Sequence, residues 1–141
     1  MALAKLPHSR FVATICILTA LYWAALFIAT HVPTPRPPGS IPRRSIDKSA
    51  HLVAFAGLAL LLCATGTALG IPAGRLYLLV LVTIAAYGIV DELTQRLVPT
   101  RSSDWRDWAA DLAGGLLGVV AFAVLAKLVL APRRQQAVDN A

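Results

Sequence analysis

Long uncharged stretches dominate the pattern of hydrophobic and polar positions along the chain. Residues 11–30 carry no charged side chain, and a helix of that length spans about 30 Å, the hydrocarbon thickness of a bilayer. Three later stretches are similarly apolar and are separated by short segments rich in proline, glycine or charge. The pattern predicts an all-α polytopic membrane protein with four transmembrane helices in a compact bundle. The predicted spans are about residues 11–31, 51–70, 76–95 and 108–130.

Polar segments complete the predicted domain organisation. Residues 1–10 form a basic N-terminal segment, residues 11–131 the transmembrane domain and residues 132–141 a polar C-terminal tail. A cleaved signal peptide is the alternative for the N-terminus, but the apolar stretch is longer than the usual h-region of about 7–15 residues. Five of the nine prolines lie in residues 32–44, which predicts an extended connector because proline fixes φ and lacks an N–H donor.

Composition supports the same class of protein. Hydrophobic residues make up 57% of the chain and charged residues only 14%, against about 25% charged residues in soluble domains. The net charge of +6 comes from basic residues between apolar runs, where they set membrane topology and meet anionic headgroups. Because no helix-turn-helix, RNA-binding or zinc-finger pattern is present, we expect the lipid bilayer and no nucleic acid as partner. Cys16 and Cys63 lie inside apolar runs, which indicates packing residues and no disulfide.

Glycine pairs mark two expected helix contacts. Gly66 and Gly70 form a GxxxG pair, and Gly114 and Gly118 form another; such pairs let two helices approach closely in a membrane. Gly70 also follows the last turn of the second span and Pro72 stands just beyond it, which is typical of a helix end.

The third apolar stretch is too short to cross the bilayer by itself. Residues 76–90 are uncharged and give roughly 22 Å of helix, so a spanning helix must continue through Asp91 and Glu92 to about Gln95. Carboxyl groups within a span cost a few kcal/mol each unless they face the bundle or water. We therefore predict that Asp91 and Glu92 lie inside the bundle, at the end of this helix.

Acidic residues collect on one side of the predicted membrane domain. Four spans place the connectors 32–50 and 91–108 on the same side, and six of the seven acidic residues lie there. These six are Asp47, Asp91, Glu92, Asp104, Asp107 and Asp111. Spacings of four residues place Asp47 with His51, and Asp91 with Gln95, on shared helix faces.

This pattern predicts one polar cluster between the second, third and fourth helices, open to one membrane face. Its predicted members are Asp47, Lys48, His51, Asp91, Glu92, Gln95, Arg101 and Asp107. Arg101 is expected to form a salt bridge with Glu92 or Asp107, because the 97–105 loop can fold back over the third helix. An inter-helix network that only fixes packing is the structural alternative. Trp105 and Trp108 are typical of residues at the membrane interface.

Four motifs resemble the VanZ-like family of bacterial membrane proteins. They are Asp47-Lys48 followed by His51 and Phe55, Asp91-Glu92 followed by Gln95, Pro99 followed by Arg101, and Asp107 followed by Asp111, Gly114 and Gly118. They follow the family order over about residues 45–120. Leu52 stands where the family usually has phenylalanine, and Asp111 where asparagine is common. The resemblance implies a membrane location and an accessory role in the cell envelope, because the family's named member is associated with low-level teicoplanin resistance.

Three classes of function remain open at this point. In a membrane-embedded enzyme or ligand-binding module, acidic and imidazole groups would act as acid and base or bind a divalent cation. The candidate catalytic residues are Asp47, His51, Asp91, Glu92 and Asp107. The candidate substrate-binding residues, for an anionic lipid headgroup or an envelope precursor, are Lys48, Gln95, Arg101 and Asp111. No HExxH-like signature predicts a metal site, and no cofactor is identified.

The other two classes need no chemistry at the cluster. A non-catalytic accessory protein of the cell envelope would use the cluster to stabilise the bundle or to dock a partner. A proton or solute conductor is disfavoured, because four short helices are few for a transporter and no inverted repeat is visible.

Basic residues give a nearly balanced signal for membrane orientation. The terminal side carries six and the connector side seven. Lys48, Arg96, Arg101 and Arg106 stand among acidic residues on the connector side and are expected to be paired there. Discounting these four leaves an excess on the terminal side, which predicts that both termini lie in the cytoplasm.

Overall fold

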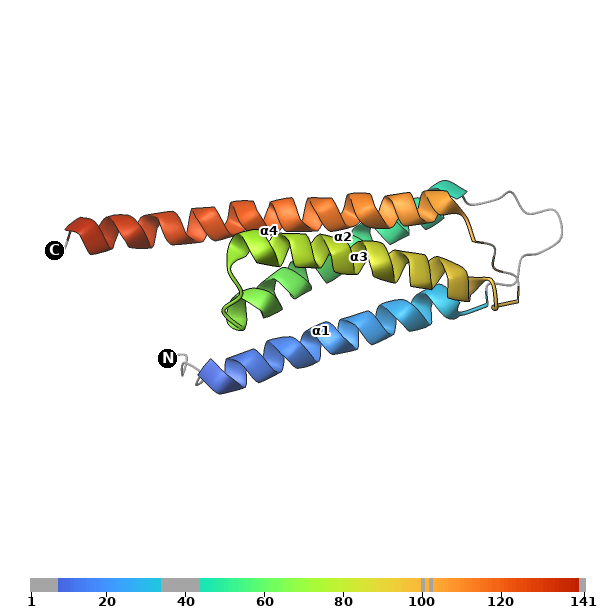
Figure 1. Cartoon of the computed structure of the whole chain (residues 1–141), viewed down its shortest axis with the longest axis horizontal. Helices are drawn as coiled ribbons and strands as arrows, with labels where there is room; N and C mark the ends of the chain where they lie inside the picture. The colour runs from blue at the N-terminus through green and yellow to red at the C-terminus, as the bar shows by residue number, and fades with distance from the viewer. Residues whose placement is uncertain (1–7, 34–43, 100, 102, 140–141) are drawn as a thin grey trace.

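The computed structural model describes residues 8–33, 44–99, 101 and 103–139, and their side chains outside residues 44–47 and 130–139. Within these residues the chain forms four helices and no strand (Figure 1). The helices are α1 (His8–His31), α2 (Arg44–Ala68), α3 (Ala73–Gln95) and α4 (Trp105–Asp139). Each contains a segment long and apolar enough to cross a membrane. The predicted all-α, four-span membrane architecture is confirmed.

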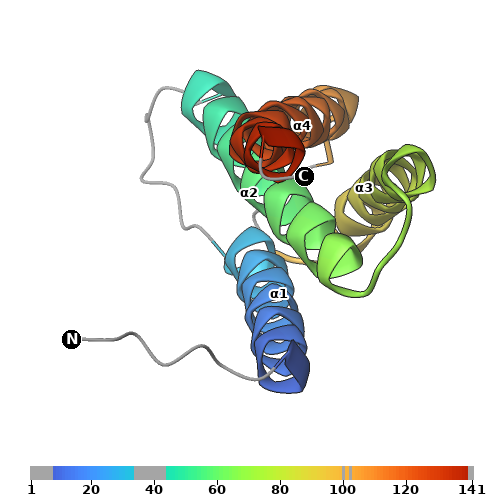
Figure 2. The ribbon, with the colours of Figure 1, turned by 90° about the vertical axis from the view of Figure 1, so that its left-hand side faces the viewer.

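Helix α2 occupies the middle of the bundle. It packs against each of the other three helices, and most extensively against α4. Seen along the bundle, α1 and α4 lie on different sides of α2, with α3 beside α2 and α4 (Figure 2). The end of α1, the start of α2, the end of α3 and the start of α4 therefore meet at one end of the bundle, and the α2–α3 turn lies at the other.

Close contact between α2 and α4 depends on glycine. A Cβ atom at Gly114 would overlap the carbonyl oxygen of Leu52, and one at Gly118 would overlap that of Ala56. The predicted close approach at Gly114 and Gly118 is confirmed, because backbone atoms of α2 occupy the space that a side chain would need.

The other glycine pair has a different role. Gly66 packs against the side chain of Leu76, while Gly70 has φ +76° and open space around it. The Gly70 N–H donates to Thr67 O over 3.0 Å and the Ile71 N–H to Gly66 O over 2.9 Å. These bonds form a Schellman motif that ends α2, as Gly70 predicted, whereas the predicted helix contact at Gly70 is wrong.

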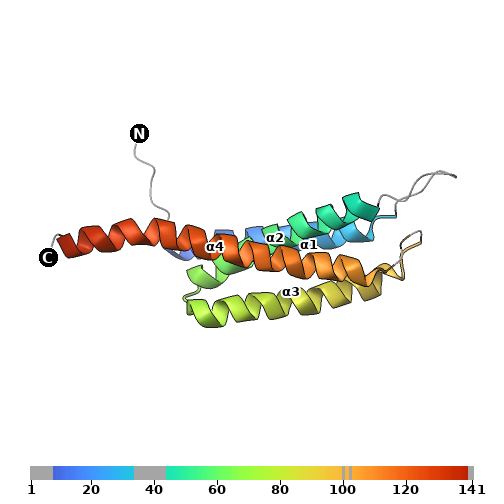
Figure 3. The same ribbon diagram turned by 90° about the horizontal axis from the view of Figure 1, so that it is seen from above.

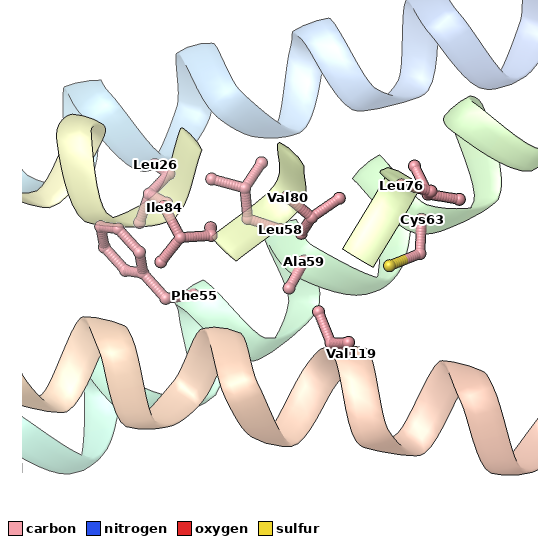
Figure 4. Close-up of a cluster of buried hydrophobic side chains, with 9 residues drawn as sticks. All are labelled: Leu26, Phe55, Leu58, Ala59, Cys63, Leu76, Val80, Ile84 and Val119. Atoms are coloured by element: carbon pink, nitrogen blue, oxygen red, sulfur yellow. The ribbon is translucent and has the colours of Figure 1, made fainter. Parts of the chain in front are cut away.

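All four described helices contribute to the apolar core. Its residues are Leu26 from α1, Phe55, Leu58, Ala59 and Cys63 from α2, Leu76, Val80 and Ile84 from α3, and Val119 from α4 (Figure 4). Many other large apolar side chains are exposed on the outside of the helices, as expected for surfaces that lipid covers. Both cysteines are free thiols.

The helices extend beyond the predicted spans. Helix α2 begins at Arg44, and α4 begins at Trp105 and continues to Asp139, through most of the predicted tail. Figures 1 and 3 show the C-terminal part of α4 extending past the other three helices. Hydropathy marks only the segment that lipid surrounds, whereas backbone hydrogen bonding continues through polar residues.

Candidate functional site

Asp91 is the centre of the polar end of the bundle. Its side chain is fully buried near the end of α3. The Thr30 hydroxyl donates to Oδ1 over 2.7 Å, and the Gln95 amide donates to Oδ2 over 2.6 Å. Glu92 is also buried. The prediction that Asp91 and Glu92 lie inside the bundle is confirmed.

Helix α1 contributes two polar residues that the sequence pattern did not include in the cluster. Besides Thr30, His31 joins the site, with its Nε2 2.8 Å from Thr94 Oγ1 and its Nδ1 2.8 Å from Phe27 O. Nδ1 lies 3.8 Å from Asp91 Oδ1. In the sequence, both residues lie where the first apolar stretch meets the connector, which was a signal that they belong to the polar end. Helical spacing could not assign them to the cluster, because it relates only residues within one helix.

His51 and Asp111 form a buried pair between α2 and α4. His51 Nδ1 lies 2.8 Å from Asp111 Oδ1, so an ionised Asp111 accepts the Nδ1–H bond. The His51 ring stacks against Phe55 with their centroids 6.1 Å apart. The predicted partner of His51 was Asp47, whose side chain lies outside the described residues.

Lys48 connects α2 to the start of α4. Its Nζ lies 2.9 Å from Asp107 Oδ1 and 3.2 Å from Asp104 Oδ2. Asp104 precedes α4, and the N–H of Arg106 donates to its Oδ1 over 3.0 Å, as in a helix N-cap. This backbone N–H, together with Lys48, holds the pKa of Asp104 below its usual range. The Asp104 N–H in turn donates to Glu92 Oε2 over 2.8 Å.

Arg101 does not form the predicted salt bridge with Glu92 or Asp107. Its Nη2 donates to Ala29 O over 3.3 Å and its Nε to Val32 O over 3.4 Å. Carbonyl groups at the end of a helix lack intrahelical donors and carry partial negative charge, so a cation is stabilised there. Asp107 already pairs with Lys48, and Glu92 with a backbone N–H. The predicted position of Arg101 is corrected: it lies at the C-terminal end of α1.

Trp105 and Trp108 occupy different environments. Trp105 is 70% exposed, as expected for an interface residue, and the guanidinium of Arg106 lies 5.9 Å from its ring centroid. Trp108 is half-buried, and its Nε1–H donates to Ala85 O on α3 over 3.1 Å. Trp108 therefore also connects α4 to α3, and its position at the membrane interface stays a prediction.

A cavity of about 150 Å³ lies between α1, α2 and the loop that carries Arg101. The lining residues are Leu26, Ala29, Thr30, Ala50, His51, Ala54 and Arg101. Ala29 and Ala50 are exposed, so the cavity is open at the surface. Across the described residues, no three His, Cys, Asp or Glu side chains are placed to hold a metal ion.

We use the name polar layer for the polar side chains that form three hydrogen-bonded groups at this end of the bundle. They are Thr30, His31, Lys48, His51, Asp91, Glu92, Gln95, Asp104, Asp107 and Asp111. The layer contains Lys48, His51, Asp91, Glu92, Gln95 and Asp107 of the predicted cluster. Arg101 lies at its edge, and Asp111 belongs inside it.

The four helices and their apolar outer surfaces define a multi-pass membrane protein. The sequence profile of the VanZ/LLP1 family matches residues 5–127. The chain therefore belongs to the VanZ/LLP1 family, which confirms the predicted resemblance. No curated protein and no solved structure matches the chain.

Proposed function

We propose that this VanZ-family protein is an accessory factor of the cell envelope that lowers susceptibility to teicoplanin-type glycopeptide antibiotics. Family membership supports this role, since the family's named member is associated with low-level teicoplanin resistance. We further propose that the polar layer faces one side of the membrane and carries the activity.

Buried carboxylate oxygens with few or no partners favour a functional polar layer over a network that only fixes packing. Among the described residues, Asp111 Oδ2 is buried and accepts no hydrogen bond, and Glu92 Oε1 is buried with only the Ser103 side chain as a nearby partner. An unsatisfied buried polar group costs about 1–3 kcal/mol, more when charged. Hydrophobic side chains would pack the helices without that cost. Acceptors retained in this state are therefore candidates for contact with a ligand or a transferred proton.

Antibiotic susceptibility tests this proposal directly. Wild type, Asp91→Asn and Arg75→Gln are expressed at equal membrane abundance in a teicoplanin-susceptible strain. Arg75 is exposed at the opposite end of the bundle and serves as the control. We expect wild type and Arg75→Gln to raise the inhibitory concentration of teicoplanin, and Asp91→Asn to leave it at the value of the empty vector. A wild-type protein that is abundant in the membrane and leaves susceptibility unchanged would contradict the proposal.

A second candidate function is a membrane-embedded enzyme or ligand-binding module for an anionic lipid headgroup or a lipid-linked phosphate. Its support is the pair of side chains that line one cavity, His51 and Arg101. An imidazole oriented by a carboxylate suits general acid–base chemistry, and a guanidinium suits phosphate. Incubation of the purified protein with a lipid phosphate, followed by phosphorus NMR, would detect turnover. Turnover in wild type that persists unchanged in His51→Gln would argue against this use of His51.

The proposed orientation has both termini in the cytoplasm, which places the polar layer on the side from which an external antibiotic arrives. Its support is the excess of basic residues on the terminal side that remains when Lys48, Arg96, Arg101 and Arg106 are all discounted; discounting Lys48 alone, the one that the structure pairs, leaves six basic residues on each side. Among the described residues Lys48 contacts carboxylates, whereas Arg96, Arg101 and Arg106 form no ion pair. Thiol labelling of a cysteine at Pro33 or at Gly74, in a variant without Cys16 and Cys63, tests the orientation. Labelling of Gly74→Cys from outside intact cells would reverse it.

A further inference from the structure

Within the part of the chain whose side chains the structure describes, Arg101 is a cation without a carboxylate partner. Among the described residues no acidic side chain lies within 4.0 Å of its guanidinium, whereas Lys48 contacts two. Both recorded acceptors of Arg101, Ala29 O and Val32 O, are uncharged carbonyl oxygens. The guanidinium therefore retains its full positive charge for an external anion, and its planar fork fits phosphate oxygens.

The cavity beside Arg101 has one polar end and one apolar wall. Arg101, His51 and Thr30 contribute the polar groups, and Leu26, Ala29 and Ala54 contribute apolar surface. Its volume of about 150 Å³ equals that of engineered cavities that hold benzene. The cavity has room for a compact headgroup and the first carbons of a chain, but not for a whole lipid.

His51 is placed to support an anion next to Arg101. Its Nδ1 is occupied by Asp111 over 2.8 Å, so the carboxylate orients the ring and leaves Nε2 as the nitrogen that can meet a ligand. A protonated Nε2 would be a second donor in the cavity. Thr30 donates its hydroxyl proton to Asp91 over 2.7 Å and is not available as a donor.

We propose that this cavity binds the phosphate monoester headgroup of an anionic lipid, with Arg101 as the main ligand, His51 as a second donor and the apolar wall against the start of the lipid chain. The inference rests on the proposed ligand-binding role and assigns it a site. The exposed opening between α1 and α2 admits such a lipid from the membrane. Lys48 is not part of this site, because it is already paired with Asp104 and Asp107.

Lipid retention in native mass spectrometry tests the inference. The full-length protein is reconstituted with dioleoyl phosphatidic acid or with dioleoyl phosphatidylcholine and released from detergent in the spectrometer. The variants are Arg101→Gln, Arg101→Lys, Ala50→Phe and the matched control Arg96→Gln. Arg96 is exposed, carries the same charge on the same connector and does not line the cavity. Monodispersity in detergent is checked for each variant.

We expect wild type and Arg96→Gln to retain phosphatidic acid in preference to phosphatidylcholine. Arg101→Gln should weaken retention at least about tenfold, the effect of losing one charge-assisted contact. Arg101→Lys should retain part of it. Ala50→Phe should block retention by filling the cavity while every charge remains, so the test does not depend on Arg101→Gln folding. Equal retention by wild type and Arg101→Gln, or an equal loss in Arg96→Gln, would overturn the inference.

Added inorganic phosphate separates the two sources of a phosphate group. If phosphatidic acid resists displacement by excess inorganic phosphate, the site recognises the lipid. If free phosphate binds wild type and not Arg101→Gln, and phosphatidic acid binds no more tightly than free phosphate, the assignment to a lipid is wrong. Antibiotic susceptibility is an independent readout. If the protein retains the lipid but leaves susceptibility unchanged, only the proposed resistance role is contradicted.

Discussion

The two ends of the bundle are built by different chemistry. At the α2–α3 turn, the helices meet through backbone capping at Gly70 and apolar contacts such as Gly66 with Leu76. The nearby polar contact is between two neutral hydroxyls, Thr19 and Thr65, whose oxygens lie 2.8 Å apart. At the opposite end, the polar layer buries Asp91 and Asp111 completely.

This difference shows where the chain departs from what packing requires. Neutral hydroxyls join α1 to α2 and glycine lets α2 pack against α3 at this end, at little desolvation cost. The polar layer instead joins α1 to α3 and α2 to α4 through carboxylates, whose burial must be compensated by donors. Substitutions at the polar end should therefore have larger and more specific effects than matched substitutions at the turn.

The largest effect is expected for Gly114→Ala. The added methyl group would meet the backbone of Leu52 and Ala56, which cannot rotate away, so α4 must move from α2 and the His51–Asp111 pair must separate. We expect a loss of about 3 kcal/mol in the free energy of unfolding, at the upper end of overpacking costs, measured by denaturation in detergent. Gly66→Ala is the matched control, because its methyl group meets only the flexible end of Leu76. Equal losses in the two variants would contradict the comparison.

Asp91→Asn should have the next largest effect. One amide oxygen replaces two carboxylate oxygens, so either the Gln95 amide faces an NH₂ group and loses its acceptor, or the Thr30 hydroxyl must turn to its other acceptor, Phe27 O at 3.0 Å. The expected loss is about 2 kcal/mol in the free energy of unfolding. Thr65→Val, which removes a neutral partner at the turn, should cost about 1 kcal/mol. If Thr65→Val proves the more damaging in the same assay, the two ends do not differ as described.

Asp111→Asn should be tolerated better than Asp91→Asn. The asparagine oxygen can still accept the His51 Nδ1–H bond, and the oxygen that becomes an amide nitrogen accepts nothing in the described structure. We expect a change below about 1 kcal/mol in the free energy of unfolding. A loss as large as that of Asp91→Asn would show that the negative charge of Asp111 is required for folding.

Asp104→Asn should have the smallest effect at neutral pH, because asparagine is also a good N-cap. The pKa of Asp104 is lowered in the folded protein by the Arg106 N–H and by Lys48. Its contribution is therefore present above its ordinary pKa and is lost as pH falls through the lowered value. Melting temperatures in detergent from neutral to acidic pH should show a weaker acid dependence for the variant. Identical pH profiles would mean that Asp104 has the same pKa folded and unfolded.

Particular residues show how far the polar layer could be predicted. The positions of Asp91 and Glu92 could be predicted because the 15-residue run of positions 76–90 is too short to span a bilayer. Helix length alone therefore placed both residues in the bundle. His51 and Lys48 were correctly expected near the acids of other helices. The carboxylates that pair with His51 and Lys48 were not predicted, since spacing within one helix does not show which carboxylate on α4 faces His51. The use of these residues as catalytic or substrate-binding groups stays a prediction.

Hydropathy and segment length by themselves determined that this chain is a four-span, all-α membrane protein with six of its seven acidic residues at one end. These properties depend on transfer of each segment from water to lipid, which is local to the segment. Only the tertiary structure decided that Arg101 lies at the carbonyl end of α1, that Thr30 donates to Asp91 and that His51 pairs with Asp111. Those contacts join residues about 60 to 70 positions apart. They depend on how the helices rotate and cross, which glycine contacts such as Gly114 with Leu52 set.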